Sequence, residues 1–184
     1  MKAILDVDGT LWDFHNPLIK NLHYHFPRMP TKLPTEWDWF KEYMTNEEFS
    51  NVVFDTHVEQ VGYIAFPGAD LLLKILNEKN IEVIIASNRD NALIYRLAKW
   101  LSTNKIGPID GIYAGRDKHF LIGRGDLVID DNPNTIKYAS SIVAGSLCLK
   151  WPWNACVSDL PYVARFDGLY DMAKWIDENV PTSL

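Results

Sequence analysis

The chain has 184 residues, of which 47% are hydrophobic and 23% charged, as in an ordinary globular protein with one sizeable core. Its net charge of −6 argues against a broad nucleic-acid-binding surface, and its two cysteines, Cys148 and Cys156, favour neither a disulfide framework nor a zinc site. No apolar run is long enough to span a membrane and no signal peptide is apparent, so we expect a cytoplasmic protein with no membrane partner.

The first predicted strand is the apolar run over residues 1–5, which leads directly into Asp6, Asp8 and Gly9. In an extended strand, the i, i+2 spacing places both carboxylates on one side. Two negative charges this close are costly unless a cation or a shared proton offsets them. Gly9 permits a sharp turn after the second acid. A strand followed by a simple Asx turn would also explain these residues, so the rest of the chain must decide.

Residues 14–66 differ in character from the rest of the chain. They are rich in aromatic residues, histidine and proline, and their helical periodicity is weak. Thr45, followed three residues later by Glu48, predicts the N-cap and capping box of one helix. We interpret this stretch as a small, mostly helical cap inserted into a core that consists of residues 1–13 and 67–184.

From residue 67 onward, predicted helices alternate with predicted strands. Helices are expected at 69–79, 91–102, 133–139 and 168–180, and strands at 81–86, 109–114 and 127–129, with one or two edge strands at 142–143 and 146–149. This alternation predicts an α/β fold in which an open parallel sheet is covered by helices on both faces.

Polar side chains follow three of the predicted strands at the point where each strand ends. Ligands of such sheets bind at the carboxyl ends of the strands, so we expect these side chains to meet there. They are Asp6 and Asp8, Ser87 and Asn88, and Asp130 and Asp131. A crevice with this many carboxylates favours a hard cation such as Mg²⁺, which in turn binds phosphate oxygens. Lys118, which precedes the last acid pair, could neutralise a phosphate or a nucleophile.

These residues resemble, in chain order, the four motifs of the haloacid dehalogenase (HAD) superfamily of phosphatases. Asp6-Val7-Asp8-Gly9-Thr10 is similar to motif I, Ser87 to motif II, Lys118 to motif III and the Asp130-Asp131 pair to motif IV. Within that superfamily, residues 6–14, 116–118 and 126–131 are most similar to the 5′(3′)-deoxyribonucleotidases. The resemblance implies a Rossmann-like three-layer α/β/α core with a small cap after the first strand.

The resemblance also implies a mechanism. Asp6 would attack phosphorus to give an aspartyl-phosphate, and Asp8 would protonate the leaving oxygen and then activate water. Mg²⁺ would be held by Asp6, the backbone carbonyl of Asp8 and Asp131, while Asp130 would orient Lys118. Phosphate oxygens would be bound by Lys118 together with Ser87 and Asn88.

A nucleoside monophosphate is the substrate that the resemblance implies, and its base would bind against the cap. Phe14 could stack on the base, and a further aromatic cluster lies where a wall of the base pocket is expected: Trp37, Trp39, Phe40 and Tyr43. Aromatic clusters in small helical caps more often form the cap's own core, so this alternative stays open. A homodimer is compatible with the resemblance.

Several alternatives stay open at this stage. A 3′-phosphatase of nucleic-acid ends, a small-metabolite phosphatase or phosphotransferase, and a non-catalytic binding protein could share the fold. The five histidines show no metal-ligand spacing and are expected on the surface or in the cap. Arg89 could bind phosphate or lie in a solvated turn.

Overall fold

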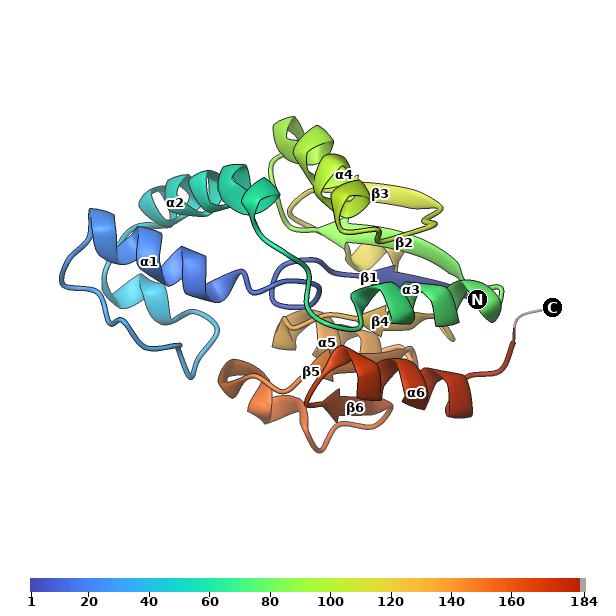
Figure 1. The fold of residues 1–184 in the computed structure, drawn as a ribbon. Coiled ribbons are helices and arrows are strands. Elements are labelled where there is room, and N and C mark those ends of the chain that lie inside the picture. The colour runs from blue at the N-terminus through green and yellow to red at the C-terminus, as the bar shows by residue number, and fades with distance from the viewer. Residues whose placement is uncertain (183–184) are drawn as a thin grey trace.

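The computed structural model describes residues 1–182, and its centre is a parallel sheet of six strands in the order β3-β2-β1-β4-β5-β6 (Figure 1). The strands are β1 (Lys2–Leu5), β2 (Glu82–Ser87), β3 (Gly111–Ala114), β4 (Leu127–Ile129), β5 (Gly145–Leu149) and β6 (Val163–Phe166). Strand β1 pairs with β2 on one side and β4 on the other, which brings the segments after these three strands together.

Helices cover both faces of the sheet, as the alternating pattern predicts. On one face lie α3 (Ala69–Glu78), α4 (Ile94–Thr103) and α6 (Leu169–Asn179), and on the other lies α5 (Pro133–Ser141), behind the sheet in Figure 1. Successive residues of a strand point to opposite faces of the sheet and pack against different helix layers. Ala3 and Leu5 of β1 belong to the larger core cluster, whereas Ile4 belongs to the cluster under α5. The expected three-layer α/β/α architecture is therefore confirmed.

Residues 14–66, which we call the cap segment, form two longer helices joined by turns. These are α1 (His15–His25) and α2 (Asn46–Glu59), with single 3₁₀ turns at η1 (Trp39–Glu42) and η2 (Gln60–Gly62). Thr45 accepts a hydrogen bond from the Glu48 amide and its own amide donates to the Glu48 side chain, so the predicted capping box is present. Figure 1 shows α1 and α2 beyond the carboxyl ends of the strands.

The cap segment packs as a continuation of the main core. Phe14, Leu18, Leu22, Met29 and Val52 are buried in the same cluster as the residues of β1 and α3. This shared core gives α1 and α2 a fixed position above the strand ends.

Two expectations for the last third of the chain are wrong. Residues 142–143 form a turn, in which Val143 has a φ of 61°, and β5 lies inside the sheet because β6 pairs with its outer side. The edge strand β6 was not predicted, since it has four residues and includes a charged side chain at Arg165. The remaining short 3₁₀ turns are η3 (Asn91–Leu93), η4 (His119–Leu121) and η5 (Pro152–Val157).

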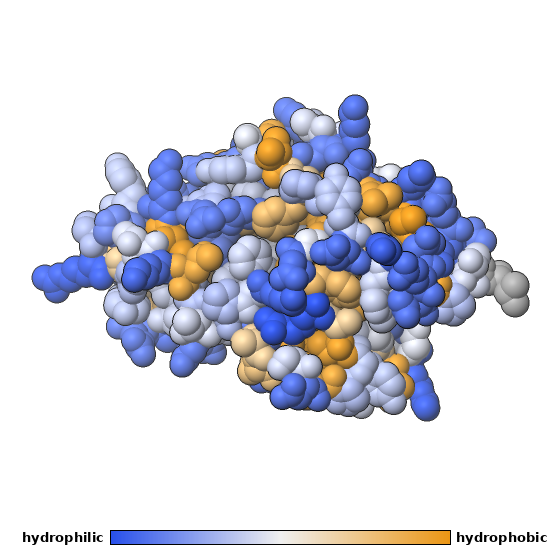
Figure 2. Space-filling view, turned by 60° about the horizontal axis from the view of Figure 1, so that its bottom comes forward, coloured by the Kyte–Doolittle hydropathy of each residue, from blue (hydrophilic) through white to orange (hydrophobic). Residues whose placement is uncertain are grey.

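On the face drawn in Figure 2, hydrophobic side chains form small separate groups among hydrophilic ones. Within residues 1–182, no helix has both the length and the apolar character needed to cross a bilayer.

Candidate active site

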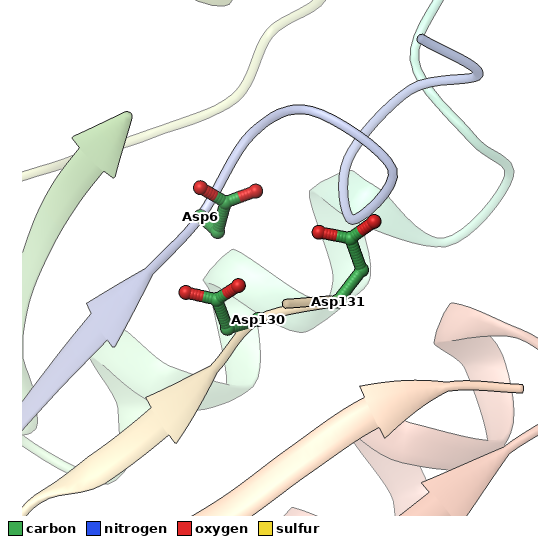
Figure 3. Close-up of side chains that lie close together, drawn as sticks. All are labelled: Asp6, Asp130 and Asp131. Atoms are coloured by element: carbon green, nitrogen blue, oxygen red, sulfur yellow. The ribbon is translucent and has the colours of Figure 1, made fainter. Parts of the chain in front are cut away.

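Three buried carboxylates meet where the central strands end. Asp6 follows β1, and Asp130 and Asp131 follow β4 (Figure 3). One carboxylate oxygen from each lies within 4.8 Å of the others, and none of the three residues is more than 5% exposed. Pairing of β1 with β4 fixes this approach, because Leu5 is in register with Ile129 and the Asp6 amide donates to the Ile129 carbonyl at 2.8 Å.

Lys118 supplies positive charge to this cluster. Its Nζ lies 2.5 Å from Asp6 Oδ1 and 2.6 Å from Asp130 Oδ2, and it also donates to the Ala86 carbonyl at 3.3 Å. The family resemblance implies that Asp130 orients Lys118, and the two side chains are in contact. One lysine therefore bridges two of the three acids.

The negative charge of three ionised carboxylates would exceed the single positive charge that Lys118 supplies. Burial raises the pKa of Asp6 well above its usual range, and the neighbouring carboxylates add to this effect although Lys118 opposes it. Burial likewise raises the pKa of Asp131, with a hydrogen bond from His15 acting in the opposite direction. A divalent cation would relieve this repulsion, and carboxylate oxygens are the donors that Mg²⁺ prefers. The cluster therefore fits a hard metal ion. Asp6 and Asp131 could each supply one carboxylate oxygen to it.

Asp8 belongs to a separate hydrogen-bond network beside the cluster. Its carboxylate accepts from Trp12 Nε1 at 2.8 Å, from Ser87 Oγ at 3.0 Å, from His57 Nε2 at 3.0 Å and from the Arg89 guanidinium. Burial alone would raise the pKa of Asp8, but Arg89 and His57 outweigh it and hold the pKa far below its usual range. Asp8 is therefore a carboxylate in this structure.

Ser87 lies within this network rather than on the wall of the cavity described below. Its hydroxyl donates to Asp8 and accepts from Arg89 Nε at 2.7 Å, whereas the neighbouring Asn88 faces the cavity. Arg89 is buried and also donates to Gln60 Oε1 at 2.6 Å, so the expectation of a solvated turn arginine is wrong.

Two histidines lie in the site, although the sequence gives neither a role. His15 Nε2 is 3.0 Å from Asp131 Oδ2, and His57 contacts Asp8; both side chains are buried, not on the surface. The sequence does hold a signal for His15, because this residue directly follows the segment 6–14, which begins with the residues that resemble motif I. His57 carries no local signal, since it is 49 residues from Asp8 and only the fold of the cap segment brings the two together.

A cavity of about 290 Å³ opens above the carboxylates and is walled by the cap segment. Asp6, Lys118 and Asp131 lie on its floor, and the wall includes Pro34, Trp37, Trp39, Phe40, Phe49 and Val53. A wider groove of about 1050 Å³ continues between α2 and the segments after β2 and β3, and Arg116 borders it. Space for a small ligand therefore adjoins the acids.

The aromatic residues named from the sequence divide into three groups. Trp37, Trp39 and Phe40 line the cavity, although Phe40 stacks on Phe49 at 3.7 Å between ring centroids. Phe14 borders the cavity, but one face of its ring is stacked on His57 at 5.0 Å. Tyr43 is 44% exposed and is not among the residues that line the cavity.

The fold is similar to that of several solved structures described as HAD hydrolases or phosphatases. No family model matches the chain. A HAD family hydrolase from Deinococcus radiodurans R1, with bound phosphate and sodium, has a TM-score of 0.68 at 15% identity, covering 100% of this chain and 98% of that one. A predicted phosphoglycolate phosphatase from Haemophilus somnus 129PT has a TM-score of 0.64 at 15% identity, covering 94% and 96%.

A third structure, a HAD-hydrolase from Bacillus subtilis bound to magnesium, has a TM-score of 0.59 at 18% identity, covering 96% of this chain and 98% of that one. The described part of the chain, residues 1–182, therefore shares the α/β fold of these HAD hydrolase structures.

Proposed function

We propose that the protein is a Mg²⁺-dependent phosphomonoesterase that removes phosphate from nucleoside and deoxynucleoside monophosphates. The observation that most supports this function is a cluster of charged side chains at the floor of a cavity walled by aromatic residues of the cap segment. The cluster consists of Asp6, Asp130, Asp131 and Lys118. HAD hydrolases with a similar fold, one with bound phosphate and sodium and one bound to magnesium, support phosphate-ester chemistry on this scaffold. Ligands of open parallel sheets bind at the carboxyl ends of the strands, where these acids lie.

In the proposed reaction Asp6 is the nucleophile. One Asp6 oxygen forms a bond to phosphorus while the bond from phosphorus to the leaving oxygen breaks, which gives an aspartyl-phosphate and an alcohol. Water then attacks the same phosphorus, and the bond to Asp6 breaks to release inorganic phosphate. Bound Mg²⁺, held by Asp6, the Asp8 carbonyl and Asp131, would offset the charge of the phosphate oxygens.

Asp8 is assigned the proton transfers. It gives a proton to the leaving oxygen and later takes one from water. The lowered pKa of Asp8 favours its ionised form, which suits the second role. A phosphate dianion beside Asp8 raises its pKa by charge repulsion, so we assign the first role to the substrate-bound enzyme.

Phosphate binding is assigned to Lys118, Asn88 and Ser87. Lys118 and Asn88 already face the cavity. The Ser87 hydroxyl, now engaged with Asp8 and Arg89, would exchange one of these hydrogen bonds for a phosphate oxygen. The base is assigned to the wall formed by Trp37 and Trp39, whose rings are only half-buried.

The proposal places the enzyme in the cytoplasm. Both cysteines are free, which fits a reducing compartment. The net charge of −6 favours a small phosphate ester over an extended nucleic acid as the substrate.

The test is phosphate release from the 5′- and 3′-monophosphates of nucleosides and deoxynucleosides, a 3′-phosphorylated oligonucleotide and a generic aryl phosphate, each with Mg²⁺ or with EDTA. The Asp6→Asn variant should be inactive, while the matched control Asp13→Asn, which alters an exposed hydrogen bond to Asn16, should keep wild-type rates. Best activity on deoxynucleotides, with a requirement for Mg²⁺, supports the proposal.

Other outcomes would overturn parts of it. Asp6-dependent cleavage of the aryl phosphate without any nucleotide activity would retain the chemistry and reject the substrate. Preference for the phosphorylated oligonucleotide would favour a nucleic-acid 3′-phosphatase. No activity from a folded protein on any of these esters would favour a binding protein.

A further inference from the structure

We propose that His15 is a positioning residue, which holds the carboxylate of Asp131 in the orientation that binds the metal ion. This inference rests on the proposed function, because that function makes Asp131 a metal ligand. Its basis is the contact between His15 Nε2 and Asp131 Oδ2 at 3.0 Å. With Asp131 ionised, its oxygen accepts and the imidazole nitrogen donates.

The His15 ring is itself held in place by aromatic neighbours. The ring of Trp153 lies 4.0 Å from it between centroids, and Trp151 stacks on Trp153 at 4.9 Å with the two planes only 9° apart. Phe14 contacts the ring edge-on at 5.6 Å. Trp151 Nε1 donates to the Gly9 carbonyl at 2.7 Å, so this stack is anchored to the turn after Asp8. A ring fixed in this way can orient its hydrogen-bond partner.

The contact between His15 and Asp131 depends on a glycine at position 9. A Cβ atom on Gly9 would collide with Asp131 Oδ2 and would lie 2.7 Å from His15 Nε2. Gly9 also has a φ of 73°, a conformation that other residues rarely adopt. The turn therefore passes directly over the paired side chains, and a side chain at residue 9 would separate them.

His15 acts through Asp131 rather than as a further ligand. Among the described residues, the ligand atoms that lie within 4.8 Å of one another come from Asp6, Asp130 and Asp131, and the imidazole is not among them. Its hydrogen bond occupies one oxygen of Asp131 and leaves the other for the cation. Hydrogen bonds to a ligating carboxylate of this kind fix its orientation, and their loss typically weakens metal affinity by about 10- to 100-fold.

The experiment measures Mg²⁺ binding to the full chain by isothermal titration calorimetry after removal of metal with EDTA. His15→Gln retains an N–H near the position of Nε2, whereas His15→Met has similar length and no donor. We expect His15→Met to raise the Kd for Mg²⁺ by at least about 10-fold and His15→Gln to stay within about 3-fold of wild type. His23→Met, on the same helix but bonded to the Met29 carbonyl, is the matched control and should bind like wild type.

Equal Mg²⁺ affinity of the Gln and Met variants would overturn the inference, and so would wild-type affinity of His15→Met. If His15→Met does not fold, His15→Asn replaces it, because its short amide cannot reach Asp131, and the same two outcomes apply. The variant Asp131→Asn distinguishes failure of the proposed metal site from failure of the role given to His15. Wild-type Mg²⁺ affinity of Asp131→Asn would reject the proposed metal site itself, whereas its loss beside an unaffected His15→Met would reject only the role of His15.

Discussion

The guanidinium of Arg89 contacts both carboxylate oxygens of Asp8, at 3.0 and 3.2 Å, and its side chain is completely buried. The same guanidinium donates to Gln60 of the cap segment. Because Asp8 belongs to the loop after β1 and Arg89 to the segment after β2, one cation joins two core segments and the cap. Its removal should therefore affect both the fold and the site.

Replacing Arg89 by methionine should destabilise the protein strongly. It leaves the largely buried Asp8 with fewer partners, and breaking a buried ion pair costs about 3–5 kcal/mol. Urea unfolding at pH 7 measures the loss. The control is Arg96→Met, because Arg96 also reaches the cap, at the Val58 carbonyl, but in an exposed position. A loss no greater than in the control would show that the Arg89–Asp8 pair contributes little.

The contribution of this pair should also depend on pH. The pKa of Asp8 is lower in the folded chain than its usual value, so the stabilisation is complete above about pH 4. It is lost as pH falls from there toward the folded-state pKa, because the unfolded chain then takes up a proton that the folded chain does not. Between pH 6 and pH 3, wild type should lose more unfolding free energy than Arg89→Met. Equal losses would contradict the lowered pKa.

Removal of Lys118 should make the fold depend on a divalent cation. Lys118→Met leaves Asp6 and Asp130 without their shared ammonium group, at a cost of about 3–5 kcal/mol in EDTA. Mg²⁺ should restore part of this stability and should stabilise the variant more than wild type. Urea unfolding with and without Mg²⁺ tests both points, with Lys74→Met, an exposed partner of Glu78, as control. The idea fails if Mg²⁺ stabilises variant and wild type equally.

The two cysteines should react very differently with a thiol reagent. Cys148 is buried in β5, and burial raises the pKa of its thiol to about 11, whereas Cys156 is exposed. Since the thiolate is the reactive form, one thiol per chain should be labelled in the native protein and two in urea. Peptide mapping should find the native label on Cys156. Rapid native labelling of Cys148 would show that β5 opens.

The cap wall should contribute to affinity for the base. Trp39→Ala removes an aromatic surface from the cavity, and loss of one stacked base typically costs about 1–3 kcal/mol, which corresponds to roughly 5- to 150-fold in Kd. KM for nucleotides should rise while activity on a small alkyl phosphate stays unchanged. Tyr43→Ala is the matched control, since Tyr43 is close in sequence but does not line the cavity. Equal effects of the two substitutions would reject base stacking on Trp39.

The core and its acidic cluster could be predicted because their signals are local. The apolar runs of β1, β2 and β4 end in polar residues, and parallel pairing brings those ends together without further information. Asp6, Asp130 and Asp131 accordingly lie where the strand pattern places them. The short strand β6 escaped prediction because its half-buried residues alternate weakly and its one charged side chain, Arg165, hides the pattern.

The partners of Asp8 could not be predicted because they depend on packing across the cap. His57 lies 49 residues from Asp8, on helix α2, whose periodicity says which side is apolar but not what that side faces. Gln60, which accepts a hydrogen bond from Arg89, follows in the turn η2 and carries no local signal either. The burial of Arg89 is likewise a consequence of that contact. Sequence patterns predict individual helices and strands. The hydrogen bonds that join Asp8 and Arg89 to the cap segment depend instead on how those helices and strands pack together.

The central position of β1 has a consequence for synthesis on the ribosome. Its two neighbours, β2 and β4, lie about 80 and 125 residues later in the chain. Asp6 therefore leaves the ribosome long before Asp130. One side of β1 can pair with β2 once Ile85 has emerged, but its other side must remain unpaired until Ile129 has emerged. Such late closure of distant pairs exposes apolar strands for longer, which makes nascent chains prone to aggregation. We therefore expect chaperones that bind short apolar segments to bind β1 at this stage.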